Sequence, residues 1–185
     1  YALRLAAALA QIGLASGDQV TVQLFAGRAG RFGPSRGRGQ SFRLFDWLAD
    51  QPAAGQTDLG ADLAAYAGRG ARPGLALLIS DLWSPAGFQP GVTALLARGH
   101  QVALLHLLSP DELDPPLGGD LRLVDVESGA AQEVTIDRPM RQLYQRRLAE
   151  WQAENRAWCR ARAVHYVPVS TALPWDQLVL RTLRT

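Results

Sequence analysis

Two short stretches of the sequence place oxygen-bearing side chains where a ligand could bind. Residues 75–81 read Leu-Ala-Leu-Leu-Ile-Ser-Asp, an apolar run that ends abruptly in Ser80 and Asp81. Such a run is typical of a strand buried on both faces of a parallel sheet. Its polar tip then lies at the carboxyl edge, where open α/β sheets bind ligands. Upstream, Gly55 opens a turn that carries Thr57 directly before a helical pattern. This hydroxyl and this carboxylate are hard oxygen ligands that suit a magnesium-like ion.

The same residues also have ordinary structural explanations. Thr57 could cap the helix that follows it, and Asp81 could simply end its strand. Asp58 is better suited to stabilise the first turn of the helix than to bind a metal. Five further side chains could line this edge of the sheet: Asp58, Ser80, Trp83, Asp111 and Glu112.

Asp111 and Glu112 follow a second buried strand and could act as a paired acid and base. No further catalytic group is identifiable, so a capped turn after Pro110 is favoured. Trp83 follows Asp81 and is either an exposed anchor for a protein partner or a core residue. The sequence leaves these two explanations of Trp83 equally open.

Histidine and cysteine provide no metal centre. The three histidines lack metal-ligand spacing, and Cys159 alone cannot supply a zinc set. His106 lies inside an apolar strand and is expected to be buried and hydrogen-bonded, while Cys159 is expected to pack in the core. A nucleophilic arrangement of Cys159 with His165 has no supporting motif. No G-x-x-x-x-G-K-[ST] loop or G-x-G-x-x-G turn indicates a nucleotide site.

Length, composition and charge limit the class of protein. The 185 residues and 48% hydrophobic content predict one globular domain, and a net charge of +2 gives no argument for nucleic acid. A single cysteine fits a reducing compartment, so we expect a cytoplasmic protein. No apolar run approaches the roughly 20 residues of a spanning helix, so no membrane contact is expected, although an upstream anchor stays open. The chain begins at Tyr1 in a helical pattern, and we expect an upstream strand to be missing.

Apolar periodicity predicts alternating helices and strands. The expected helices cover residues 5–12, 42–49, 59–66, 91–98, 138–158 and 175–183. The expected strands cover residues 19–25, 75–80, 102–108 and 164–169, with a hairpin formed by 121–126 and 133–136 around Ser128-Gly129. Asp137 is expected to cap the long helix, with Pro139 in its first turn. This order predicts a three-layer α/β/α Rossmann-like domain with a mostly parallel sheet and a hairpin excursion.

Residues 26–41 are rich in glycine and arginine, with Arg28, Arg31, Arg36 and Arg38 among them. They could bind phosphates or an acidic partner. A solvated, flexible loop is favoured because five glycines fall between residues 27 and 39.

The order of motifs resembles the von Willebrand factor A-type domains of the bacterial group called domain of unknown function 58. The resemblance covers nearly the whole chain. The matching pieces are Ser16–Val20, Gly55–Leu59, Leu78–Asp81, Ser109–Leu113, Asp125–Gly129, Tyr144 and Cys159.

The resemblance implies a metal-ion-dependent adhesion site that binds Mg²⁺ or Mn²⁺. Thr57 matches the threonine of that site and Asp81 matches its aspartate. The remaining Asp-x-Ser-x-Ser loop should directly precede the helix at Tyr1, and no such motif occurs in these 185 residues. The family further implies a MoxR-type AAA+ ATPase as partner, in the assembly or maturation of other proteins.

Three functions follow as hypotheses. The first is a non-enzymatic, metal-dependent protein-interaction module, in which a partner carboxylate completes the metal site. The second is a small α/β metal-dependent hydrolase that uses Asp81 and Asp111. The third is a structural domain with a degenerate metal site. A missing first strand would also open the centre of the sheet, so a dimer through the exposed sheet is expected.

Overall fold

The computed structural model describes residues 1–25, 30–52, 57–70, 72–116, 119–124 and 131–182. Three strands form a parallel sheet in the order β3-β4-β7. They are β3 (Leu75–Ser80), β4 (Gln101–Leu108) and β7 (His165–Ser170). These bounds confirm the predicted strands to within two residues.

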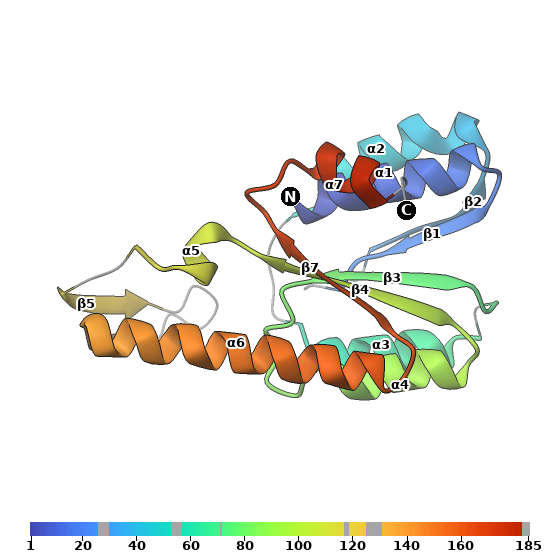
Figure 1. Cartoon of the computed structure of the whole chain (residues 1–185). Coiled ribbons are helices and arrows are strands. Elements are labelled where there is room, and N and C mark those ends of the chain that lie inside the picture. The colour runs from blue at the N-terminus through green and yellow to red at the C-terminus, as the bar shows by residue number, and fades with distance from the viewer. Residues whose placement is uncertain (26–29, 53–56, 71, 117–118, 125–130, 183–185) are drawn as a thin grey trace.

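Helices cover both faces of this sheet (Figure 1). One layer contains α1 (Ala2–Ala15), α2 (Ser41–Ala49) and α7 (Trp175–Thr182). The other contains α3 (Leu59–Gly68), α4 (Gln89–Ala97) and α6 (Arg138–Arg160). The α/β prediction is therefore confirmed: apolar side chains on both faces of the parallel strands require a helical layer on each side.

Two antiparallel hairpins accompany the sheet. One joins β5 (Gly119–Val124) to β6 (Ala131–Ile136), as predicted, and extends beyond the start of α6 (Figure 1). The Asp125–Gly129 motif and its Ser128-Gly129 turn lie outside the described residues. As expected, Asp137 caps α6, because its carboxylate accepts the Met140 amide hydrogen at 2.8 Å.

The second hairpin corrects the expected glycine- and arginine-rich loop. Strand β2 (Arg31–Arg36) pairs with β1 (Gln19–Gln23), and a 3₁₀ turn follows at Arg38–Gln40. Phe32 is the apolar residue of β2, and it packs into a small core with Leu44 and Leu48 of α2. An edge strand tolerates proline and charged side chains, so β2 lacks the alternation that would have marked it.

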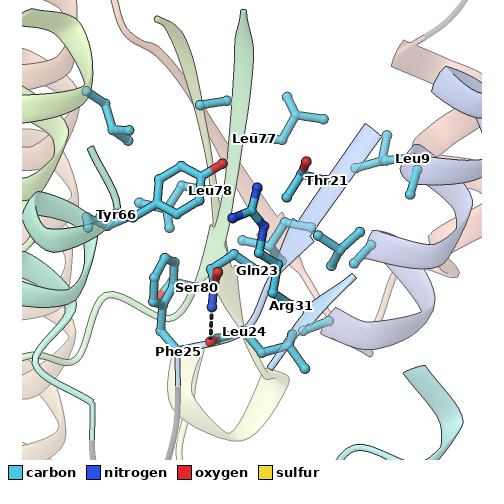
Figure 2. Close-up of a pocket in the computed structure, with 18 of the residues that line it drawn as sticks. Leu9, Thr21, Gln23, Leu24, Phe25, Arg31, Tyr66, Leu77, Leu78 and Ser80 are labelled. Atoms are coloured by element: carbon cyan, nitrogen blue, oxygen red, sulfur yellow. Dashed lines mark hydrogen bonds between the residues drawn. The ribbon is translucent and has the colours of Figure 1, made fainter. Parts of the chain in front are cut away.

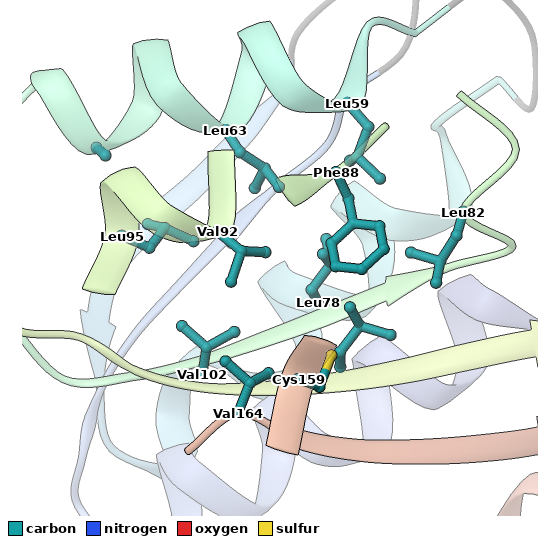
Figure 3. Packing of buried hydrophobic residues seen from close by; sticks show 12 residues of the cluster. Leu59, Leu63, Leu78, Leu82, Phe88, Val92, Leu95, Val102, Cys159 and Val164 are labelled. Carbon is teal, nitrogen blue, oxygen red and sulfur yellow. The ribbon is translucent and has the colours of Figure 1, made fainter. Parts of the chain in front are cut away.

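The main core lies between the sheet and the α3–α4–α6 layer (Figure 3). Val92 and Leu104 are completely buried, and Phe88 packs edge-on against Trp158 with ring centroids 5.3 Å apart. A second cluster on the opposite face joins Ile79 of β3 to Leu5 of α1. Alternate residues of β3 therefore face the two helical layers.

The expectation that β3 is buried on both faces is wrong at its first residues. Leu75 is 66% exposed and Leu77 is 40% exposed. Among the described strands β3 pairs only with β4, so its other edge and the flanking side chains face an open groove.

Candidate functional site

The carboxyl edge of the sheet gathers the predicted ligands. The Thr57 hydroxyl donates a hydrogen bond of 2.7 Å to the carbonyl oxygen of Phe25, just past β1. Asp58 caps α3, accepting the Ala61 amide hydrogen at 3.0 Å. Thr57 therefore does not cap this helix. It joins the end of β1 to the start of α3 and keeps its oxygen lone pairs for another contact.

Two side-chain acceptors fold the tip of β3 into a tight turn. Ser80 Oγ accepts the Leu82 amide hydrogen at 3.0 Å, and Asp81 Oδ1 accepts the Trp83 amide hydrogen at 3.1 Å. Leu82 has a φ of 64°, unusual for a branched side chain. This conformation costs of order 1–3 kcal/mol, and Leu82 is held in it by its own burial in the main core.

His106 of β4 holds this turn through a hydrogen bond to the backbone of Asp81. Its ring is fully buried, with Nε2 3.0 Å from the Asp81 carbonyl oxygen and Nδ1 2.5 Å from the Tyr166 hydroxyl. A carbonyl oxygen only accepts, so Nε2 carries the proton and Nδ1 accepts from Tyr166. Burial lowers the pKa of His106, outweighing the opposite effects of its hydrogen bond to Asp81 and of the Asp81 and Glu112 charges. The prediction of a buried, hydrogen-bonded histidine is confirmed.

Trp83 lies on the surface of this edge, 54% exposed. Its ring stacks on Trp151 of α6 with centroids 4.5 Å apart and planes 18° apart. Its Nε1–H donates to Glu112 Oε1 at 3.3 Å. The structure thus gives Trp83 an exposed position, which an anchor for a partner requires.

Glu112 has a structural role in the short helical turn α5 (Pro110–Leu113). Ser109 and Glu112 form a capping box, in which Glu112 Oε2 accepts the Ser109 amide hydrogen at 2.6 Å. The Tyr144 hydroxyl donates to the Glu112 carbonyl oxygen at 2.6 Å. The capped turn is confirmed. Both Glu112 carboxylate oxygens have structural partners, and Asp111 is exposed beside them.

A groove of about 1860 Å³ runs between β1 and β3 and opens at this edge (Figure 2). Its lining includes most of the predicted site: Thr57, Asp58, Ser80, Asp81 and Trp83. Asp111 and Glu112 are not among its lining residues. Glu112 accepts a hydrogen bond from Trp83, which does line the groove.

The donors in this groove fit a hard cation only in part. Thr57 and Asp81 offer one hydroxyl and one carboxylate, a set that suits a Mg²⁺ ion that keeps several waters. Within the described parts of the chain, no three or more His, Cys, Asp or Glu side chains form a metal cluster. Thr57 and Asp81 could therefore hold a Mg²⁺ ion whose remaining ligands come from water or from groups other than the described side chains.

Cys159 is fully buried, and burial raises the pKa of its thiol to about 11. It is a packing residue, as expected. Sequence reasoning missed Trp151 and Tyr166 as neighbours of His106. Both occupy apolar positions on a helix and a strand, so no local signal distinguishes them from other core aromatics.

None of the helices in the described residues is long and apolar enough to cross a membrane.

Uncharacterized proteins of mycobacteria are similar to this chain. An uncharacterized protein of Mycobacterium avium is 29% identical over 114 residues, which cover 62% of this chain and 67% of the relative. An uncharacterized protein of Mycobacterium tuberculosis is 28% identical over 139 residues, which cover 75% of this chain. The matched region spans only 44% of that relative's length.

The fold is shared with a solved structure. The crystal structure of the conserved hypothetical protein BatB from Bacteroides thetaiotaomicron matches with a TM-score of 0.50 at 14% identity, covering 100% of this chain and 87% of the other. The family model described as protein of unknown function DUF58 matches residues 1–154, and the chain therefore belongs to that family.

Proposed function

We propose that this chain is a non-enzymatic protein-interaction domain that binds its partner through the carboxyl edge of the sheet, with the help of a divalent cation. The observation that carries the proposal is the placement of Thr57 and Asp81 in the lining of one groove, although 23 residues separate them in the sequence. The Thr57 hydroxyl donates a hydrogen bond to the Phe25 carbonyl oxygen, and Asp81 Oδ1 accepts one from the Trp83 amide. Each retains lone pairs for a cation.

Mg²⁺ is the cofactor that this donor set favours, with Thr57 and Asp81 as its ligands. When bound, it supplies a coordination position for a carboxylate of the partner. The exposed ring of Trp83 beside this position adds apolar contact area, since aromatic residues are common anchors of interfaces. The von Willebrand factor A-type likeness supports a MoxR-type AAA+ ATPase as the partner.

A hydrolase receives less support from the geometry. Its second carboxylate would come from the turn after β4, but Glu112 caps that turn and Asp111 does not line the groove. Carboxylates that act on one substrate must converge on it.

The proposal is tested by calorimetric titration with MgCl₂ of the natural polypeptide that contains residues 1–185. We expect saturable binding that Asp81→Ala abolishes and Thr57→Val weakens at least about tenfold, the loss of one ligand contact worth about 1.4 kcal/mol. Asp111→Ala is the matched control, an acid removed from the same edge but outside the groove. Equal Mg²⁺ binding in all four proteins would refute the metal site. If the ATPase still binds both the Thr57→Val and the Asp81→Ala variants, the metal site has no role in binding this partner.

A further inference from the structure

Basic side chains gather at the edge of the sheet opposite the candidate site. β3, β4 and β7 are parallel, so all three begin at this edge, here called the amino edge. α3, α4 and α6 each end shortly before one of these strands, and Figure 1 shows their C-terminal ends on the same side of the molecule. The arginines at these helix ends and in the connections to the strands are Arg69, Arg72, Arg98, Arg160 and Arg162.

The three connections are neighbours in space. The Gln101 amide donates to the Gly74 carbonyl oxygen at 3.1 Å, so the connection before β3 contacts the one before β4. A Cβ atom on Gly99 would lie 3.6 Å from Pro73, which confirms this close approach. β4 also pairs with β7, so the third connection lies beside the second. The five arginines therefore belong to one end of the molecule, although more than 90 residues separate the first from the last.

No acidic residue balances these arginines along their own connections. Residues 66–75, 95–101 and 156–165 contain no Asp or Glu. All five arginines are exposed, and none of them forms an ion pair with an acidic side chain in the described parts of the chain. In the other helical layer, Asp18 before β1 is offset by Arg36, since Arg36 pairs with Gln19 at the start of β1.

Stabilisation of the helices accounts for only part of this charge. A cation near a helix C-terminus interacts favourably with the helix dipole. This effect explains Arg160 in the last turn of α6, and Arg69 and Arg98 at the C-caps of α3 and α4. Three helix C-termini together carry the equivalent of about −1.5 elementary charges, less than a third of the charge of five arginines. The amino edge therefore keeps an excess of positive charge.

The backbone at this edge favours carboxylates over phosphates as the bound anions. Phosphate sites commonly use the amide hydrogens of a helix N-terminus or of a backbone nest, whereas α3, α4 and α6 direct their carbonyl ends to the amino edge. The guanidinium group of arginine can bind a carboxylate through two parallel hydrogen bonds without such help.

The side chains around the arginines also argue against a nucleic acid or a membrane. Trp158 is not open to stacking with bases, because Arg162 lies 4.3 Å from the centre of its ring and Phe88 packs against it. Among the exposed large apolar side chains of the described residues, Leu75 belongs to this edge, as the first residue of β3. One leucine is too little apolar surface for insertion into a lipid layer.

We propose that the amino edge binds an acidic, extended segment of a partner protein through Arg69, Arg72, Arg98, Arg160 and Arg162. Three packed helices with axes about 8–10 Å apart give this edge a width of about 20 Å, which about six extended residues span. Asp81, Asp111 and Glu112 at the carboxyl edge repel the same segment. Neither Thr57 nor Asp81 takes part, so the inference does not depend on the proposed function.

The test is the fluorescence anisotropy of a labelled octaglutamate peptide, titrated with the natural polypeptide that contains residues 1–185, in EDTA and about 50 mM NaCl. We expect saturable binding that the double change Arg98→Gln and Arg160→Gln weakens at least about tenfold, because two charge-assisted contacts are lost. About 300 mM NaCl should also weaken binding at least about tenfold, since salt screens exposed charges. Both arginines are exposed, so the Tm of the double variant should stay near that of the wild type.

The matched control is the double change Arg146→Gln and Arg147→Gln. It removes the same formal charge from exposed positions of α6, about 20 Å from Arg160 along the helix. It should alter the affinity for the peptide less than about twofold. Equal losses in the two double variants would overturn the proposal, because binding would then follow net charge alone.

Two further results would overturn the proposal. One is the absence of saturable peptide binding. The other is tighter binding, in the same buffer, of vesicles that contain phosphatidylserine or of a single-stranded oligonucleotide with the charge of the peptide. Asp81→Ala should bind the peptide as tightly as the wild type does, so failure of the Mg²⁺ site and failure of this surface are separate results.

Discussion

His106 shows how one buried side chain sets the geometry of the candidate site. Its Nε2–H holds the carbonyl of Asp81, and Tyr166 holds Nδ1. The side chain of Asp81 is not used in this contact: its Oδ1 accepts the Trp83 amide hydrogen, and Asp81 lines the groove. Because the donor at Nε2 and the acceptor at Nδ1 belong to the neutral ring, His106 is a positioning residue that works in its uncharged form.

This arrangement predicts a dependence of stability on pH. Burial lowers the pKa of His106 in the folded chain, so the unfolded chain takes up a proton first as the pH falls below about 6.5. We expect His106 to contribute a loss of free energy of unfolding of at most about 2 kcal/mol between pH 7 and pH 5, measured by urea denaturation. His106→Gln should remove this part of the loss. His165→Gln, at an exposed histidine, should leave it intact, and the same pH profile in both variants would contradict the prediction.

At the scale of the elements, two glycines allow α3 and α4 to pack closely. A Cβ atom on Gly91 would lie 2.4 Å from the Leu63 Cβ and 2.8 Å from the Gly60 carbonyl oxygen. A Cβ atom on Gly60 would lie 2.7 Å from the Gly87 carbonyl oxygen. This contact positions α3, which begins directly after Thr57 and its N-cap Asp58.

Gly91→Ala should therefore force the two helices apart. We expect a decrease in the free energy of unfolding of about 1–3 kcal/mol, the usual cost of overpacking. Gly68→Ala is the control within α3, since nothing lies within 4 Å of its added Cβ. It should leave stability unchanged or raise it by up to about 1 kcal/mol. Both are measured by urea denaturation, and a neutral Gly91→Ala would show that the interface relaxes freely.

For the whole molecule, the open apolar edge of β3 governs association. Leu75 and Leu77 are exposed on β3, which pairs with β4 alone among the described strands. Such edges can pair with other chains, so this edge is where we expect two copies of the chain to associate.

Residues 1–185 by themselves should therefore form dimers as their concentration rises, measured by sedimentation velocity. Leu77→Lys should shift them to monomers, because a lysine on an edge strand opposes pairing. Leu143→Lys changes an equally exposed leucine on α6 and should leave the dimers unchanged. A wild-type chain that stays monomeric at every concentration would contradict this prediction.

Local patterns in the sequence predicted most of the elements and several buried residues. The apolar period marked β3, β4 and α6, and the carboxylate of Asp137 marked the start of α6 because a cap acts within three residues. His106 was expected to be buried because its strand is apolar on both sides. These features depend on neighbours along the chain, which the sequence displays directly.

Only the tertiary structure decided the features that depend on distant contacts. β2 is a strand because β1 pairs with it and Phe32 enters the core, although its own residues predict a loop. The Thr57 hydroxyl is hydrogen-bonded to the carbonyl oxygen of Phe25, which is 32 residues away in the sequence. Trp83 stacks on Trp151 of α6. Hydrogen bonds and ring contacts across such separations leave no periodic signal in the sequence. The groove between β1 and β3 arises from the way these separately predicted strands are placed in space.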